Sequence, residues 1–318
     1  MRILKFGGKS LSTKEKVQNV CEYVKKIYQK DKQIILVVSA MGNRTNELVE
    51  KAELFSGNKT QSRELDVLLS IGETETSALV AMLLNSMNVP AKSFQGFQIQ
   101  LETFGAFGNS KIAYINKKAL LDAMQEKFVS VVAGFQGINR NGEITTLGRG
   151  GSDTTATAIA SVFEQPVEIY SDFDGVFCGD PRILNFKKIK KINYDTMRQM
   201  SESGAKVLDS RAVSIAKQFN INILSKSSSD LNKNGTLVSN IENDVVAISN
   251  IDNLCKITIT FSNKSKFKFI AQNVIKEIKE MNFYNLTCEN NIISFYISSS
   301  LKNNLMLLLS KKFNLLKK

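Results

Sequence analysis

The stretch TLGRGGSD, residues 146–153, places two charged side chains on a glycine-rich backbone. Glycines allow a backbone to lie close to a ligand. Arg149 offers a planar guanidinium that can hold a carboxylate through two parallel hydrogen bonds. Asp153 stands at the start of a helix-like segment, where free amide groups attract anions. The pattern predicts a binding site for a small anionic molecule, and a capped turn without a ligand is the alternative.

Two more glycine-containing stretches follow predicted strands. KFGGKS, residues 5–10, joins Lys5 to a glycine pair, a pattern typical of a backbone that approaches phosphate but also of a tight turn. It has neither the GxGxxG spacing of a dinucleotide site nor the GxxxxGK[ST] spacing of a Walker loop. SAMGNRTN, residues 39–46, carries the hydroxyl side chains Ser39 and Thr45, which can bind an anion or cap the next helix.

Acidic side chains complete the set of candidates. Glu73 begins an apolar, helix-like segment, where it can interact with the helix dipole or hold a substrate ammonium group. YSDFDGVFCGDPR, residues 170–182, follows a predicted strand and forms a polar rim suited to a ribose, a phosphate or a magnesium-bound nucleotide. No residue is assigned as a metal ligand.

The elements that must position these side chains alternate along the chain. Helical periodicity at 13–29, 45–55, 72–87, 152–163 and 206–219 is interleaved with apolar, strand-like runs at 2–6, 33–40, 128–135, 167–173 and 221–226. Such alternation predicts an α/β fold, with a mostly parallel open sheet sandwiched by helices. Ligands of such sheets bind beyond the carboxyl ends of the strands, where the stretches above lie.

The texture of the sequence changes near Ser239. A strand-like segment at 245–261, a helix at 268–281, a hairpin at 282–298 and a helix at 301–313 predict a small α+β module. We therefore expect two domains, residues 1–238 and 239–318.

Composition restricts the chemistry. The chain of 318 residues has a net charge of +12, but its lysines are scattered, which favours a solvated surface over a nucleic-acid partner. There is no histidine, the commonest general base, so chemistry must depend on lysine, arginine, carboxylates or substrate positioning. The four cysteines lack zinc-site or disulfide spacing. No signal peptide or apolar run of membrane-span length is visible, so we expect a cytoplasmic protein with no membrane partner.

Taken together, the motifs resemble the amino-acid-kinase family, and specifically the aspartokinases. The resemblance covers residues 1 to about 238 and includes, in the family's order, KFGGKS, VVSAMGNRTN, LLSIGE, FGNSKI, VVAGFQG, TLGRGGSDTTA, YSDFDGVFCGDPR, GAKVLDSRAV and GTLV. It implies transfer of a phosphoryl group from ATP, with Mg²⁺, to the side-chain carboxylate of L-aspartate, which gives 4-phospho-L-aspartate on the way to lysine, threonine and methionine. The alternatives are a kinase for another small substrate, such as glutamate or a nucleotide, and a catalytically weak amino-acid-sensing subunit.

The resemblance also assigns roles to individual residues. It implies that Lys5 and Asp153 form the catalytic centre, with Arg149 on a substrate carboxylate and Glu73 near the substrate's amino group. The remaining substrate-binding positions are Ser39, Thr45 and Ser152. The nucleotide-binding positions are Lys5, Phe6, Gly7, Gly8, Ser171, Asp172, Phe177, Arg182 and Lys206.

Some positions depart from the family's pattern. Lys9 replaces a threonine, Thr74-Glu75 replaces Arg-Ile, Phe107 stands where histidine is frequent, and Phe177 replaces a tyrosine. The C-terminal module resembles an ACT domain, of which relatives commonly carry two, whereas this chain has room for about one. We expect a homo-oligomer held partly by this module, with little inhibition by lysine or threonine.

Overall fold

The computed structural model describes residues 1–57, 62–181, 186–242, 254–260, 267–279, 282–289, 292–302, 304–305 and 308. The chain divides into two compact units, Met1–Ser249 and Asn250–Lys318. The boundary expected at residues 238 and 239 falls inside strand β12 (Thr236–Ser239), which pairs within the main sheet of the first unit. The division into a catalytic domain, residues 1–238, and an ACT-like domain, residues 239–318, stays a prediction.

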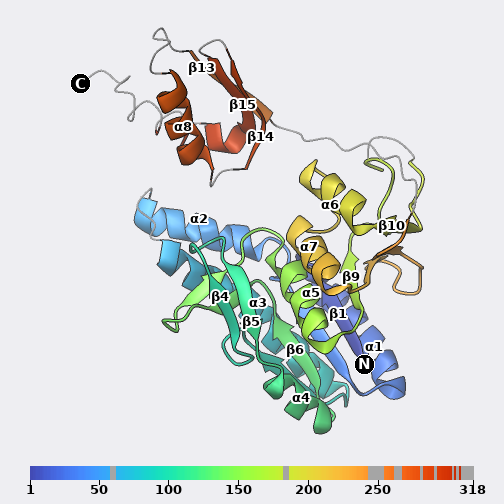
Figure 1. Ribbon diagram of the computed structural model, residues 1–318. Coiled ribbons are helices and arrows are strands. Elements are labelled where there is room, and N and C mark those ends of the chain that lie inside the picture. The colour runs from blue at the N-terminus through green and yellow to red at the C-terminus, as the bar shows by residue number, and fades with distance from the viewer. Residues whose placement is uncertain are drawn as a thin grey trace. The chain divides into compact units, whose positions relative to one another are not determined.

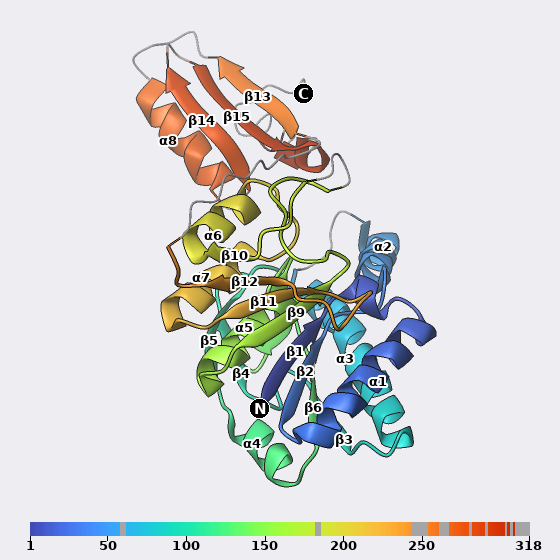
Figure 2. The ribbon, with the colours of Figure 1, turned by 90° about the vertical axis from the view of Figure 1, so that its right-hand side faces the viewer.

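The first unit is built on an eight-stranded sheet in the order β10-β12-β11-β9-β1-β2-β6-β3 (Figure 2). The six strands from β11 to β3 run parallel, and β12 is antiparallel to β11. The strands are β1 (Arg2–Phe6), β2 (Ile34–Val38), β3 (Ala91–Phe94), β6 (Val129–Ala133), β9 (Val167–Ser171), β10 (Lys191–Asn193) and β11 (Ile223–Ser227). The predicted mostly parallel sheet is thus confirmed.

Helices cover both faces of this sheet, and two hydrophobic clusters fill the space between the layers (Figures 1 and 2). Strand β1 shows how one strand serves both faces: Ile3 packs into one cluster, while Leu4 and Phe6 pack into the other. The helices are α1 (Lys14–Lys30), α2 (Arg44–Ser56), α3 (Ser62–Ser86), α4 (Lys118–Gln125), α5 (Gly151–Phe163), α6 (Tyr194–Glu202) and α7 (Ser210–Phe219).

A second, four-stranded sheet in the order β5-β4-β7-β8 was not expected from the sequence. Its strands are short, and their alternation of buried and exposed residues is weak. The last strand of this sheet, β8, ends at Thr146, where the glycine-rich stretch begins. The strands are β4 (Leu101–Phe104), β5 (Lys111–Ile115), β7 (Gln136–Ile138) and β8 (Ile144–Thr146).

Helix α3 is longer than predicted, and by length and composition alone it is long and apolar enough to cross a membrane. The expectation that no segment approaches that length and composition is therefore wrong. Half of its most apolar stretch is buried inside the protein, as is typical of a helix that contributes to a core.

The second unit is a small α+β module. It contains β13 (Leu254–Thr260), α8 (Phe267–Ile278), β14 (Phe283–Glu289) and β15 (Ile292–Ser298), with β15 central in an antiparallel sheet. The predicted hairpin at 282–298 is confirmed. Most of the helix predicted at 301–313, and the start of the strand-like segment at 245–261, lie outside the described residues. The order of elements is thus that of the predicted α/β domain and small α+β module.

A buried polar cluster ties β1, β9 and β11 together. Glu168 accepts a hydrogen bond of 2.7 Å from Arg2 Nε and one of 2.8 Å from the Tyr170 hydroxyl, and it lies 3.3 Å from Lys226 Nζ. Tyr170 stacks on Phe6, with ring centroids 4.4 Å apart. Because Glu168 and Lys226 are almost fully buried, each depends on the other's charge.

We predict that Glu168→Gln lowers the free energy of unfolding by about 3 kcal/mol, because it leaves the buried ammonium of Lys226 without a counter-charge. Urea unfolding followed by circular dichroism measures the change. Lys118→Ala, which removes only an exposed ion pair with Asp122, is the control and should cost less than about 1 kcal/mol. Equal unfolding midpoints for the two variants would contradict the assignment of this cluster as a stabilising one.

Candidate active site

A buried ion pair lies at the carboxyl end of the central strand. Lys5 Nζ, near the end of β1, is 2.5 Å from Oδ1 of Asp153, in the first turn of α5. Each residue is only 8% exposed. The strand's alternation explains the placement, because Lys5 and Ile3 share the face of the sheet that packs against α5. Among the predicted site residues, the structure brings these two into direct contact.

Glu73 is a second buried charge in this region. It is 4% exposed, on α3, and its Oε1 accepts a hydrogen bond of 3.0 Å from the amide of Ala40. Its Oε2 has no hydrogen-bond partner within the described part of the chain. Burial raises the pKa of Glu73 to about 7, although the Ala40 amide and the charge of Lys5 act in the opposite direction. This carboxyl therefore changes its charge near neutral pH.

The glycine pair after β1 is held tightly between neighbouring turns. The amide of Gly7 donates to the carbonyl of Tyr170 at 3.2 Å, so it is engaged in the fold. A side chain on Gly8 would place a Cβ 2.5 Å from the carbonyl oxygen of Ala40, which explains the need for glycine there. The amide of Ser39 donates to the carbonyl of Phe6 at 3.2 Å. The turns that follow β1 and β2 are therefore neighbours.

Of the predicted nucleotide-binding residues, Ser171 ends β9, and Asp172 and Phe177 lie in the loop beyond it. Asp172 Oδ2 lies 2.8 Å from Nζ of Lys9, the residue that departs from the family's threonine, and both side chains are exposed. Phe177 forms an isolated bridge with Lys188, and Lys206 is exposed just before α7. The Ser171 hydroxyl accepts a hydrogen bond from the amide of Phe173 at 3.2 Å. Arg182 lies outside the described residues.

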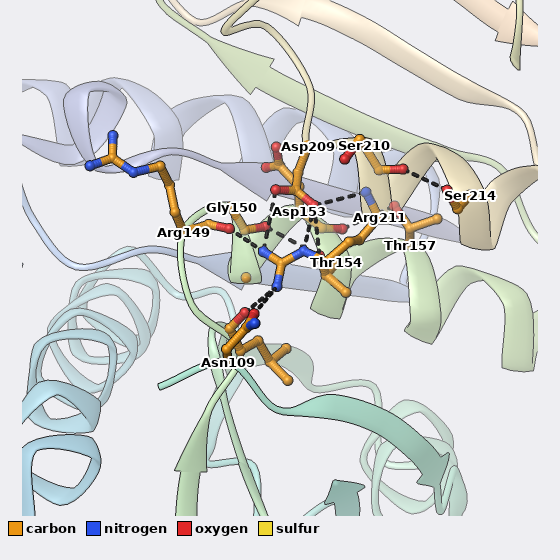
Figure 3. A network of polar contacts seen from close by, with 12 residues as sticks. Asn109, Arg149, Gly150, Asp153, Thr154, Thr157, Asp209, Ser210, Arg211 and Ser214 are labelled. Carbon is orange, nitrogen blue, oxygen red and sulfur yellow. Dashed lines mark hydrogen bonds and ion pairs between the residues drawn. The ribbon is translucent and has the colours of Figure 1, made fainter. Parts of the chain in front are cut away.

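The glycine-rich stretch forms a turn that leads into α5 and contains two glycines in the left-handed backbone conformation. Gly148 and Gly150 have φ angles of +72° and +74°, a region that favours glycine. The residue before the helix is Gly150, so Ser152 and Asp153 are buried inside the first turn and do not cap it. The side chain of Arg149 is exposed and points away from the polar network beneath it (Figure 3). Arg149 is therefore accessible to a ligand.

One helix cap was predicted wrongly. Thr45 is the second residue of α2, and the residue before that helix is Asn43. The half-buried Thr45 hydroxyl is thus not assigned to capping.

Sequence reasoning missed the residues that hold the loops. Asp66, buried in α3, accepts hydrogen bonds from the amide of Gly108 at 2.9 Å and from the amide and hydroxyl of Thr146, both at 2.7 Å. Arg211 and Asp209, at the start of α7, contact the glycine-rich turn (Figure 3). A carboxylate in the otherwise apolar stretch DVLLSIG was a usable signal for Asp66.

Comparisons with known proteins show the family of this chain. The model of the amino acid kinase family matches residues 1–224. A protein described as an aspartokinase from Rickettsia felis is 37% identical over 91% of this chain and 78% of its own length. This chain belongs to the aspartokinases of the amino acid kinase family.

Another aspartokinase, from Geobacillus stearothermophilus, is 42% identical over 74% of this amino acid kinase and 58% of its own length. The chain therefore spans little more than half of that relative. In fold, it matches E. coli aspartokinase III in complex with aspartate and ADP, with a TM-score of 0.79 and 22% identity, over 98% of this chain and 83% of that one. The predicted family and fold class are confirmed.

Because the pKa of Glu73 lies near 7, we predict that kcat/KM for an amino-acid acceptor falls as the pH drops from 8 to 6. Glu73 was predicted to lie near the substrate's amino group, and its protonation would remove the negative charge that attracts an ammonium group there. A bound ammonium lowers this pKa, so kcat, which reports the complex, should change less. Steady-state kinetics at several pH values provide the measurement. Glu73→Gln should lack this inflection, and its persistence in that variant would assign the titration to another group.

Proposed function

We propose that this amino acid kinase transfers the γ-phosphoryl group of ATP to the side-chain carboxylate of L-aspartate, giving 4-phospho-L-aspartate. The observation that carries the proposal is the buried Lys5–Asp153 pair at the carboxyl end of β1. Asp153 of this pair lies in the first turn of α5, directly after the turn that carries Arg149. The named aspartokinases among its relatives, and the fold match to one holding aspartate and ADP, support this substrate pair.

The acceptor is recognised through its opposite charges. The exposed guanidinium of Arg149 binds a carboxylate through two hydrogen bonds. Glu73, whose Oε2 has no hydrogen-bond partner among the described residues, binds the ammonium group when ionised. An amino acid satisfies both groups at once, whereas a nucleoside monophosphate has no ammonium for Glu73. The hydroxyl groups of Ser39, Thr45 and Ser152 complete the acceptor site.

The transfer itself needs no strong base, because the attacking carboxylate is already ionised at neutral pH. Catalysis then consists of positioning and of neutralising the charge that develops on the phosphoryl oxygens. Lys5 supplies that positive charge, and Asp153 holds its ammonium group in place. The absence of histidine is compatible with this chemistry.

The nucleotide lies along the loops after β1 and β9. Phe6, Gly7 and Gly8 contact its phosphates, and Ser171, Asp172, Phe177, Arg182 and Lys206 contact the rest of the nucleotide. No group of three acidic, cysteine or histidine residues that could cage a metal occurs in the described part of the chain. Mg²⁺ is commonly held by substrate phosphates with one or two carboxylates, and in this proposal it would neutralise phosphate charge.

The second unit supports a proposal on assembly. Strands β13 and β14 are the edges of its sheet, and each is paired on one side only within the described residues. An exposed edge strand favours pairing with another chain. We therefore propose a cytoplasmic homo-oligomer joined partly through this module. Weak inhibition by lysine and threonine stays a prediction, which titration of activity with each amino acid tests.

The experiment that tests the function is an ADP-release assay with aspartate, glutamate and UMP as separate acceptors. Aspartate should support release well above the acceptor-free rate, and glutamate and UMP much less. Preferential release with glutamate would replace the proposed acceptor. No acceptor-dependent release with any of them would favour a sensing subunit instead.

Lys5→Ala should lower kcat by about 10²–10³, because it removes a charge that acts mainly in the transition state. The KM for aspartate should change little. Lys217→Ala, which removes an exposed ammonium paired with Asp195, is the matched control and should leave kcat unchanged. Near-normal turnover of Lys5→Ala at saturating substrates would remove Lys5 from the catalytic centre.

A further inference from the structure

The turn that carries Arg149 lacks the side chains that normally fix a loop. Residues 148, 150 and 151 are glycine, and two of them have left-handed φ angles. Glycine loses more conformational freedom on folding than any other residue. A single conformation of this turn therefore requires contacts from outside it.

Arg211, from the first turn of α7, supplies those contacts. Its guanidinium donates hydrogen bonds to the carbonyl oxygens of Leu147 and Arg149, and so binds the backbone on both sides of Gly148 (Figure 3). A third contact, of 3.5 Å, reaches Oδ1 of Asn109. One side chain thus connects the turn to α7 and to the loop before β5.

Asp209 holds this guanidinium in position. Its Oδ1 accepts hydrogen bonds of 3.0 Å from both Nε and the backbone amide of Arg211, and it caps α7. A Cβ on Gly150 would lie 2.2 Å from Asp209 Oδ2, so the carboxylate also packs against the turn itself. The fork of Arg211 has little freedom between Asp209 and the two carbonyl groups.

We propose that Arg211 is a positioning residue for the acceptor site: it holds the turn at residues 147–151 in the conformation from which Arg149 binds the acceptor's carboxylate. This rests on the proposed function, because it needs Arg149 in acceptor recognition. The side chain of Arg149 faces away from Arg211, which contacts only its carbonyl oxygen (Figure 3). Arg211 therefore acts through the backbone of the turn, and the guanidinium of Arg149 stays accessible to the acceptor.

The expected effect is on acceptor affinity. A turn that adopts the competent conformation about a tenth of the time weakens apparent acceptor binding about tenfold. Arg211→Ala should raise the KM for aspartate by about that factor or more, while the KM for ATP stays within about twofold. Added guanidinium ion should partly restore the aspartate KM of this variant and have no such effect on the unaltered chain. Arg211→Lys should restore it incompletely, because one ammonium cannot reproduce the fork.

Arg198→Ala is the matched control. It removes a guanidinium from α6 that pairs only with Glu202 among the described residues, and it should leave both KM values unchanged. A purely structural role for Arg211 would alter both KM values and kcat together, without rescue by guanidinium. That result would overturn the proposal.

Hydrogen exchange on the full, ligand-free chain separates this inference from the proposed function. Arg211→Ala should speed exchange of the amides at residues 147–153, and Arg198→Ala should not. Unchanged protection in Arg211→Ala would overturn the positioning role, whatever the acceptor. Faster exchange in a chain that does not use aspartate would instead locate the failure in the assignment of the acceptor, and the KM comparison would be repeated with the acceptor that is used.

Discussion

The buried ion pair between Lys5 and Asp153 constrains the rest of the first unit. Two charges at this depth lose their hydration, so each is tolerable only beside its partner. The pair forms because β1 directs Lys5 to the face that α5 covers, and because the turn before α5 places Asp153 in its first helical turn. The open parallel sheet brings the turns after β1 and β2 to the same edge, where Glu73 adds a second carboxyl whose pKa burial raises to about 7. A phosphoryl transfer that needs fixed charge and no strong base fits this arrangement.

Rigid elements and glycine turns have complementary tasks around that pair. The sheet and its helices fix Lys5 and Glu73 directly, because both residues belong to regular elements. The turn at 147–151 cannot fix itself, and polar side chains from distant helices hold it. Asp66 of α3 binds the end of β8, and Arg211 of α7 binds the carbonyl groups that follow. The backbone that carries Arg149 is thus contacted from positions well away from its own side chain.

Much of this was predictable from the sequence, for physical reasons that differ by element. The run IILVV predicted strand β2 correctly, because a strand buried on both faces is apolar throughout. The helical periodicity of α1 and α5 predicted these helices correctly, because burial places apolar residues at a regular spacing. The small sheet β4-β5-β7-β8 was missed because three- to five-residue strands leave almost none. Of the two interpretations of Thr45, the helix cap was wrong, because several polar residues precede α2 and any of them could have been the cap. Arg211 was seen only as part of a motif, since a residue that binds backbone carbonyl groups 62 and 64 residues away in the sequence has no local signature.

The central claim is that the acceptor of the phosphoryl group is the side-chain carboxylate of aspartate. Acyl phosphates react with hydroxylamine to give hydroxamates, which keep a record of the carboxylate that was phosphorylated. The full chain should be incubated with ATP, Mg²⁺, aspartate and hydroxylamine, and the product should be located by mass spectrometry. The account predicts the side-chain hydroxamate of aspartate in amounts equal to the ADP released. ADP with no hydroxamate, or a hydroxamate on the α-carboxylate, would contradict it.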